Sequence, residues 1–190
     1  YIGIDVDKSA ILSASSEYTI INNDTILPKN VRKRTAEFWT GKLPTINAVI
    51  ANPPWSSEKI YNRDDLRKAG YELTAGQYDS FVLFLELAYK IVCENGIFAF
   101  IIPDSIFDSQ NENLRRFLIR NTEIKVIARL GEKLFDEVNR AKDVITDDLG
   151  CMYLTVLKYL NQLEPKKSFF YQEFSPDGTP RNGTPPRKYF

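Results

Sequence analysis

Hydrophobic residues along this chain fall into short continuous runs that are separated by longer polar segments. Ile46–Ala51 and residues 97–102 are largely apolar, which is typical of strands buried on both faces of a parallel sheet. Between them, apolar residues recur at helical spacing from Asp79 until Asn95 and Gly96, a pair that typically ends a helix. This alternation of strands and helices predicts an α/β fold with a parallel sheet.

The same patterns assign the rest of the chain. Predicted strands occupy residues 1–7, 18–21, 46–51, 97–102, 123–130 and 151–159, and the last of these is expected to close the sheet. Predicted helices occupy residues 8–16, 79–94 and 109–120, and residues 27–44 form a loop or a short helix. Residues 56–75 are polar without clear periodicity, which predicts either a lid over a neighbouring site or a solvated insertion. Residues 131–150 are a second polar loop, and the proline-rich residues 164–190 predict an exit segment or linker.

Composition restricts the chemistry. The chain has 190 residues, of which 43% are hydrophobic, enough for one domain with a sizeable core. With His 0, a histidine triad, metal site or general base is excluded, and no other metal spacing is present. No run approaches a membrane span, the start is no signal peptide, and Cys93 and Cys151 read as reduced core residues. These features predict an intracellular protein.

The most specific element is the four-residue stretch Asn52, Pro53, Pro54 and Trp55, directly after a predicted buried strand. Two prolines end that strand and fix a stiff corner, at the strand end where open α/β sheets bind ligands. The Asn52 side-chain oxygen and the Pro53 carbonyl could accept hydrogen bonds from both N–H groups of an exocyclic amine. The lone pair of the amine would then point at an electrophilic methyl group. Trp55 could stack on the base. The competing interpretation is a proline-stiffened turn with a core tryptophan.

Two acidic residues end the first two predicted strands. Asp5 is placed to accept both hydroxyls of a ribose, as an acid does in nucleotide-binding sheets, although a turn residue is nearly as good an interpretation. Asp24 could accept a hydrogen bond from an adenine amino group, but an Asn-Asp turn is the safer interpretation of Asp24 alone. Both interpretations stay open at the level of single residues.

Taken together, these motifs resemble the adenine-specific DNA methyltransferases of restriction–modification systems, which carry an Asn-Pro-Pro-aromatic motif. Residues 3–7 resemble the strand whose first acid binds the cofactor ribose, and residues 23–24 resemble the position that reads the cofactor adenine. Residues 76–86 and 95–105 look like the helix–strand block that follows the motif. Residues 130–135 are similar to a loop whose phenylalanine holds the flipped base against the motif aromatic.

The resemblance runs from residue 1 to about residue 159 and implies a Rossmann-like, S-adenosylmethionine-dependent methyltransferase. The catalytic residues that it implies are Asn52, Pro53, Pro54 and Trp55, the cofactor-binding residues are Asp5, Val6, Asp24, Thr25 and Phe84, and the base-stacking residues are Trp55 and Phe135. It also implies double-stranded DNA with a flipped adenine as partner, together with a specificity subunit or a C-terminal target-recognition domain. The expected location is the cytoplasm of a prokaryote.

The sequence departs from the family at one point. In the family a glycine-rich loop precedes the strand that corresponds to the one holding Asp5, and this sequence begins after that position. Residues 1–163 are therefore interpreted as a partial catalytic domain, truncated before that strand, and residues 164–190 as a linker. We expect the isolated chain to bind adenosylmethionine weakly or not at all, and to be inactive. With net charge +0, phosphate contacts must rest on local clusters such as residues 29–34 and 115–120.

Two other functions share these features. A protein-glutamine or ribosomal-RNA amino-methyltransferase would carry the same four-residue motif, but the long segment after Trp55, the helix block after Gly76 and Phe135 favour the DNA enzyme. A non-catalytic DNA-binding subunit would keep the fold without turnover. The intact motif argues against that second alternative, but the absence of the glycine-rich loop leaves it open.

Overall fold

The protein is described here from a computed structural model. The structure describes residues 1–7, 18–29, 31–55, 61–76, 78–130, 151–158 and 170–173, the last two ranges and residues 129–130 by their backbone only.

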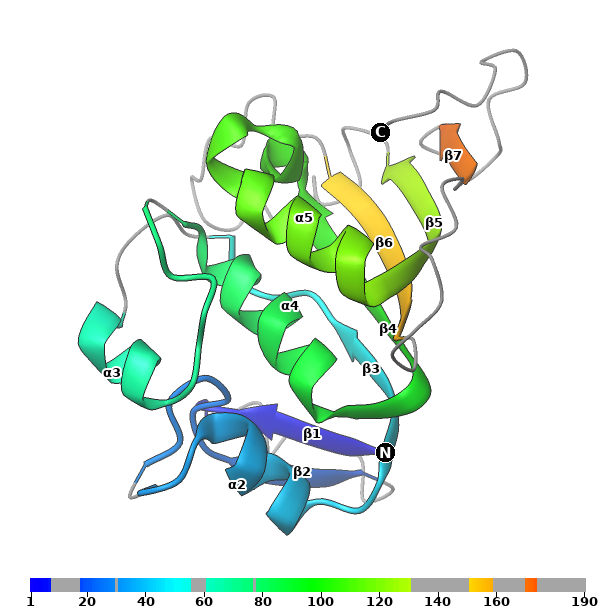
Figure 1. Ribbon diagram of the computed structural model, residues 1–190. Coiled ribbons are helices and arrows are strands. Elements are labelled where there is room, and N and C mark those ends of the chain that lie inside the picture. The colour runs from blue at the N-terminus through cyan, green and yellow to red at the C-terminus, as the bar shows by residue number, and fades with distance from the viewer. Residues whose placement is uncertain are drawn as a thin grey trace.

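The described strands form two sheets (Figure 1). The strands are β1 (Ile2–Asp5), β2 (Thr19–Asn22), β3 (Ile46–Ala51), β4 (Val92–Pro103), β5 (Thr122–Leu130), β6 (Cys151–Lys158) and β7 (Phe170–Glu173). The small sheet pairs β1 with β2 in parallel, and the large sheet has the order β3-β4-β6-β5-β7. In the large sheet β3 is parallel to β4, β5 is parallel to β7, and β6 runs antiparallel between β4 and β5. The α/β class is confirmed, but the prediction of a parallel sheet is wrong for the large sheet, because β6 makes it mixed.

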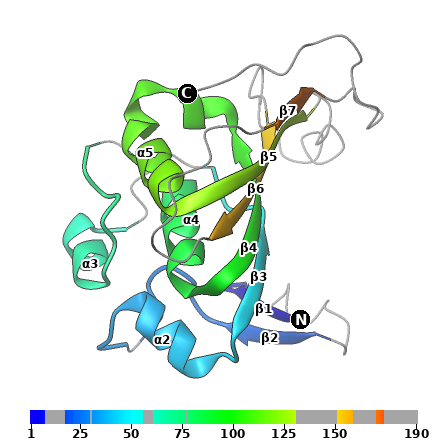
Figure 2. The same cartoon turned by 45° about the vertical axis from the view of Figure 1, so that its right-hand side comes forward.

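Helices α4 (Ser80–Ile91) and α5 (Glu112–Asn121) cover one face of the large sheet (Figure 2). The other described helices are α2 (Thr35–Lys42) and α3 (Arg63–Lys68), and two 3-10 turns, η1 (Asp104–Phe107) and η2 (Ser109–Asn111), precede α5. Within the described residues, no helix combines the length and apolarity needed to cross a bilayer.

Helix α4 is the centre of the core because it is apolar on two faces. One face, which includes Phe81 and Leu85, packs against β4 and α5 in the first hydrophobic cluster. The other face carries Leu83 and Leu87, which join Trp39 of α2 in the second cluster. Leu66 of α3 belongs to that second cluster as well, and its described buried members include none from β3, β4 or β5. Helix α4 therefore connects the large sheet to the part of the molecule around β1 and β2.

The opposite face of the large sheet is partly open. Val49 and Ala51 of β3 pack toward the helices, so their neighbour Ile50 points the other way and is 82% exposed. Ile97 of β4 is also exposed. Among the described strands, β3 is at the edge of its sheet and β1 is paired on one side only. Within this described part, each sheet ends at a strand that approaches the candidate site.

The structure differs from the sequence predictions between β3 and β4. The segment 56–75 contains α3, and Leu66, Tyr71 and Thr74 are buried, so residues 61–75 are not wholly a solvated insertion. Helix α4 ends at Ile91, before the expected stop at Asn95 and Gly96, and β4 begins at Val92. Val92 is already extended because it pairs with Ile46 of β3.

The tail also contains more structure than predicted. Strand β7 lies within residues 164–190, so β6 is not the last strand and the whole tail is not a linker. The pairing of β7 with β5 depends on partners far away in the sequence, which a local pattern does not reveal. The predicted helix 8–16 and the predicted loop 131–150 lie outside the described residues.

Candidate active site at the carboxyl ends of the strands

The corner after β3 leaves the sheet as predicted. Strand β3 ends at Ala51, and the next four residues have no regular secondary structure. Pro53 is buried, Asn52 and Pro54 are exposed, and Trp55 is half-buried. No hydrogen bond joins the Asn52 side chain to another described residue. The corner therefore combines a buried anchor with an exposed amide, as expected of a group that meets a ligand.

Among the described residues, two hydrogen bonds attach this corner to the neighbouring elements. The Ser80 hydroxyl, at the first residue of α4, donates to the Pro54 carbonyl at 2.5 Å. The Trp55 indole N–H donates to the carbonyl of Ile101 in β4 at 3.4 Å. The corner is thus secured from outside, by the helix that packs on the sheet and by the neighbouring strand.

The residue before Ser80 reaches the end of that neighbouring strand. Asp79 is buried, and its Oδ2 accepts hydrogen bonds from the Ser105 hydroxyl at 3.2 Å and from Gln110 Nε2 at 3.5 Å. Ser105 lies in η1, directly after β4. Asp79 and Ser80 therefore connect the start of α4 to the segments that follow two adjacent parallel strands.

The loop after β2 is secured by its own side chains. Asp24 Oδ1 accepts from the backbone N–H groups of Ile26 at 2.8 Å and Leu27 at 3.0 Å. Asn23 Oδ1 accepts from the N–H of Asp24 at 2.9 Å and of Lys29 at 3.0 Å. These are the contacts of an Asx turn, so the turn interpretation of Asp24 holds whatever else its carboxylate binds.

The end of β1 is more open. Asp5 is exposed, and its Oδ1 accepts from the N–H of Asp7 at 2.8 Å. Asn22 at the end of β2 donates its side-chain amide to the carbonyls of Asp5 at 3.1 Å and Val6 at 3.0 Å. The Val6 side chain is 67% exposed. The backbone at this strand end is therefore fixed, while the Asp5 carboxylate faces solvent.

Tyr61 connects the Asp24 loop to the chain that follows Trp55. Its hydroxyl lies 3.0 Å from Asp24 Oδ1 and 3.1 Å from Oδ2. Burial of the phenol raises the pKa of Tyr61 well above its usual range, and the charge and hydrogen bond of Asp24 raise it further. The hydroxyl therefore remains a protonated donor to Asp24 at neutral pH.

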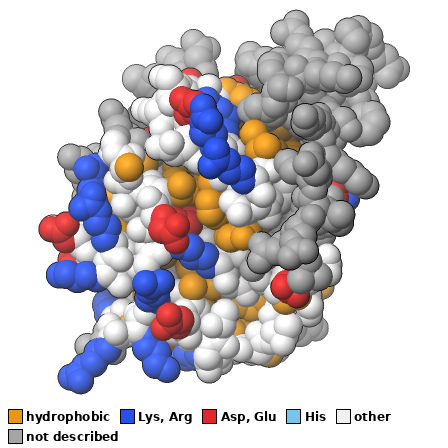
Figure 3. All heavy atoms as spheres, in the orientation of Figure 1, with side chains coloured by type: hydrophobic (Ala, Val, Ile, Leu, Met, Phe, Trp, Pro, Cys, Tyr) orange, Lys and Arg blue, Asp and Glu red, His pale blue; other side chains and the backbone are white. Residues whose placement is uncertain are grey.

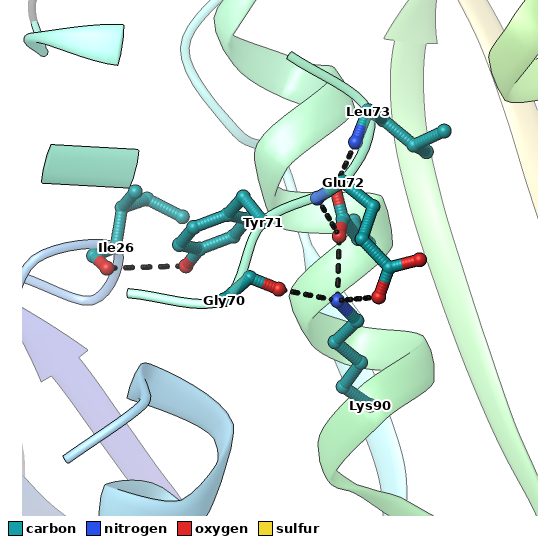
Figure 4. A network of polar contacts seen from close by, with 7 residues as sticks. Ile26, Gly70, Tyr71, Glu72, Leu73 and Lys90 are labelled. Atoms are coloured by element: carbon teal, nitrogen blue, oxygen red, sulfur yellow. Dashed lines mark hydrogen bonds and ion pairs between the residues drawn. The ribbon is translucent and has the colours of Figure 1, made fainter. Parts of the chain in front are cut away.

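A polar network fixes the segment between α3 and α4 (Figure 4). The Glu86 side chain is fully buried and accepts from the backbone N–H groups of Glu72 at 2.7 Å and Leu73 at 2.9 Å. Lys90 Nζ donates to Glu86 at 2.7 Å, to Glu72 at 3.0 Å and to the Gly70 carbonyl at 2.6 Å. A buried carboxylate needs such partners, so this network joins the segment firmly to α4.

The same segment is attached at its two ends. The Tyr71 hydroxyl donates to the Ile26 carbonyl at 3.1 Å, next to the Asp24 loop. Arg63 donates to the Gly76 carbonyl at 2.5 Å and lies over the Tyr78 ring, 5.9 Å from its centre. The path from α3 to the start of α4 is therefore fixed along its length.

The structure places the predicted site residues in two groups. Asn52, Pro53, Pro54 and Trp55 form the corner after β3, and Asp5, Val6, Asp24 and Thr25 lie at the ends of β1 and β2. Phe84 of α4 is half-buried and packs against both hydrophobic clusters, so it lies between the two groups. The Thr25 carbonyl accepts from the Trp39 indole at 2.9 Å, which gives Thr25 a structural contact. Phe135 lies outside the described residues.

Sequence reasoning missed Tyr61, Ser80 and the role of Glu86. A serine at a helix start reads as a capping residue, but Asp79 occupies the N-cap position and the Ser80 hydroxyl is directed to Pro54. Glu86 is the one acidic residue in the apolar sequence of α4, which is a signal for a buried charge with a partner. Tyr61 carries no such signal.

Comparisons with known proteins identify the family and the fold. Residues 3–135, more than half of the chain, match the family described as Eco57I restriction-modification methylase. A curated relative, the adenine-specific methyltransferase BrxX of Escherichia coli O9:H4 (strain HS), is 32% identical over 94 residues, which is 49% of this chain and 8% of that protein. The chain thus spans a small part of the length of this relative.

Solved structures share the fold. A protein from Listeria monocytogenes assigned to the class I S-adenosylmethionine-dependent methyltransferases superposes with a TM-score of 0.62 at 19% identity, over 90% of this chain and 48% of that one. A modification subunit assigned to a type I restriction enzyme of Vibrio vulnificus YJ016 has a TM-score of 0.55 at 16% identity, over 85% of this chain and 31% of that one. At these identities the likeness establishes the fold, and the sequence match identifies the family: the chain belongs to the Eco57I restriction-modification methylase family.

Proposed function

We propose that this chain carries the methyl-acceptor site of an enzyme that transfers a methyl group from S-adenosylmethionine to the N6 amino group of adenine in DNA. The observation that carries the proposal is the corner Asn52–Trp55, which presents an exposed amide and a half-buried indole at the carboxyl end of a parallel strand. Membership of a restriction-modification methylase family and the adenine-specific relative support the choice of DNA adenine.

In this proposal the corner binds the amine rather than forming a bond to the substrate. The Asn52 side-chain oxygen and the Pro53 carbonyl accept hydrogen bonds from the two N–H groups of the amine. These bonds favour a tetrahedral nitrogen with its lone pair directed outward. Trp55 stacks on the adenine once the base has left the duplex. Phe135 is proposed to contact the opposite face of the base. Bound adenosylmethionine supplies the electrophilic methyl group.

The chemistry of the residues at the ends of β1 and β2 fits the adenosine part of that cofactor. The Asp5 carboxylate is exposed and can accept ribose hydroxyls, with Val6 beside it. Asp24 Oδ1 already accepts two backbone N–H groups, so an adenine amino group would bind Oδ2, which the Tyr61 hydroxyl now approaches. Phe84, between the two groups, would contact the adenine ring, and Thr25 completes this proposed set.

The proposed partner is double-stranded DNA with the target adenine flipped out, recognised with a specificity subunit or a C-terminal target-recognition domain. Lys29, Arg32, Lys33 and Arg34 are exposed and follow β2 at the edge that holds Asp24. Lysine and arginine side chains also gather around α2 and α3 on the face shown in Figure 3. Such cations suit phosphate contacts. With DNA as substrate, we expect the protein to act in the prokaryotic cytoplasm.

A methylation assay tests the proposal. The full-length protein is incubated with methyl-labelled adenosylmethionine and plasmid DNA from a methylation-deficient host, and the nucleosides are separated after digestion. We expect label in N6-methyladenine. Ribosomal RNA and release-factor protein are the parallel substrates, and label in those alone would make the enzyme an amino-methyltransferase of another class. Absence of transfer to any of the three would favour a non-catalytic subunit.

A further inference from the structure

We propose that Ser80 is a positioning residue for methyl transfer, which it serves by fixing the orientation of the Pro54 carbonyl and hence of Trp55. This inference rests on the proposed function of the corner. Ser80 would touch neither base nor cofactor in this role. Its hydroxyl acts on the backbone of the motif.

The corner has few means of fixing its own shape. Its residues lie beyond the ladder of β3, and neither Pro53 nor Pro54 has an N–H group to donate. The rings fix φ of both prolines, and the proline after Pro53 also restricts ψ of Pro53. The ψ angle of Pro54 therefore remains the one backbone torsion between the buried Pro53 and the Cα atom of Trp55 that can rotate easily.

The hydrogen bond from Ser80 removes that freedom. The direction of a carbonyl is set by the ψ angle of its own residue, so a donor 2.5 Å from the Pro54 oxygen holds that angle in one range. Ser80 is itself 5% exposed and belongs to the first turn of α4, whose next residues Phe81 and Val82 are buried in the first cluster. The donor is therefore rigidly placed relative to the sheet.

The consequence concerns Trp55 directly. The Pro54 carbonyl belongs to the peptide plane that joins Pro54 to Trp55, so fixing it fixes where the indole begins. The second attachment, from the indole N–H to the Ile101 carbonyl, is long at 3.4 Å. With Ser80 removed, the Pro54 carbonyl would lose this donor, and the indole that follows its peptide plane would sample more orientations.

The test compares Ser80→Ala with Ser80→Thr and with Thr122→Val in the full-length protein. Thr122 is the matched control because its buried hydroxyl also donates to a backbone carbonyl, that of Leu118 at 2.6 Å, far from the corner in sequence. Single-turnover methyl transfer is measured with plasmid DNA and labelled adenosylmethionine, and cofactor affinity is measured by calorimetry. We expect Ser80→Ala to lower the single-turnover rate about tenfold and to change cofactor affinity less than about twofold.

Ser80→Thr, which keeps a hydroxyl, should restore most of the rate, and Thr122→Val should leave it unchanged. An equal rate for Ser80→Ala and wild type would overturn the inference. So would a parallel fall of rate and cofactor affinity without rescue by threonine, because that pattern indicates a general loss of structure. If wild type transfers no label, the proposed function fails first.

A second measurement decides the inference without any turnover. The protein is labelled with 5-fluorotryptophan, and the ¹⁹F resonance of Trp55 is assigned by its disappearance in Trp55→Phe. We expect Ser80→Ala to shift or broaden this resonance while that of the fully buried Trp39 stays in place. Thr122→Val should alter neither resonance. An unchanged Trp55 signal in Ser80→Ala would show that the hydroxyl does not position the ring.

Discussion

The corner after β3 and the loop after β2 both follow parallel strands, but they are secured in opposite ways. The corner is held from outside, by Ser80 of α4 and by the carbonyl of Ile101, and its Asn52 amide stays exposed. The loop after β2 is held from within, because Asp24 binds backbone N–H groups of its own loop. External support leaves the functional side chain available for a ligand, whereas internal support makes one side chain serve both shape and binding.

The largest expected effect tests the externally supported corner. Asn52→Ala should lower methyl transfer by about three orders of magnitude, because it removes a proposed acceptor for the amine protons. Cofactor affinity should stay within about twofold, because Asn52 holds none of the proposed adenosine contacts. Single-turnover assays and calorimetry on the full-length protein measure the two quantities. If activity survives, the amine-acceptor role of Asn52 is wrong.

The next change removes the buried ion pair between Glu86 and Lys90, which holds the segment between α3 and α4. Glu86→Gln should lower the free energy of unfolding by about 3 kcal/mol, because Lys90 loses a buried charged partner. Denaturant unfolding measures this loss. Glu112→Gln, in an exposed ion pair with Arg116, is the control and should have little effect. Equal stability of the two variants would show that the Glu86 network is not a main support of this segment.

A smaller effect separates the two strand-end acids. Asp5→Asn should weaken adenosylmethionine binding by about tenfold, because the exposed carboxylate is proposed to accept ribose hydroxyls. The unfolding midpoint should not change, because an asparagine oxygen can still accept from the N–H of Asp7. Calorimetry gives the affinity, and Asp64→Asn on the surface of α3 is the control. A loss of stability without a loss of affinity would make Asp5 a turn residue.

The smallest expected effect concerns the internally supported loop. Tyr61→Phe should strengthen adenosylmethionine binding by about threefold, because the hydroxyl no longer competes for Asp24 Oδ2. The raised pKa of Tyr61 keeps its hydroxyl protonated, so the difference between Tyr61→Phe and wild type should be constant from pH 6 to about pH 9. Calorimetry at several pH values tests both statements. Weaker binding in the variant would instead make Tyr61 part of the cofactor site.

The sequence was most informative where side chains follow a period. The start of α4 and helix α5 were predicted because apolar residues recur along them at helical spacing. Strand β3 was predicted from its continuous apolar run, although the expectation of burial on both faces was wrong, since its residues are only half-buried or exposed. Helix α3 was missed because its six residues are polar except for Leu66, too short a stretch for a period. The start of β4 was missed because Asn95 adopts a positive φ of 60° inside a strand rather than at a helix end.

In the candidate site, too, the local motif was predicted from the sequence and the contacts from distant residues were missed. The motif Asn52–Trp55 is contiguous, so the sequence displays it whole. The contacts that support it come from residues such as Ser80 and Ile101, which only the fold brings to the corner. Hydrogen bonds between distant segments leave no trace in local hydrophobicity, so these residues could not be found from the sequence.

Among the described strands, β1 and β3 each pair on one side only, which has a consequence for how this chain behaves in solution. An unpaired strand edge with apolar neighbours is a template for pairing between molecules, and Ile50 is 82% exposed beside one such edge while Ile2 is 43% exposed beside the other. A lysine in place of Ile50 would place a charge beside the edge of the large sheet and reduce such pairing. Recombinant yield and colloidal stability of this chain would therefore depend on an apolar surface next to the corner that carries Asn52.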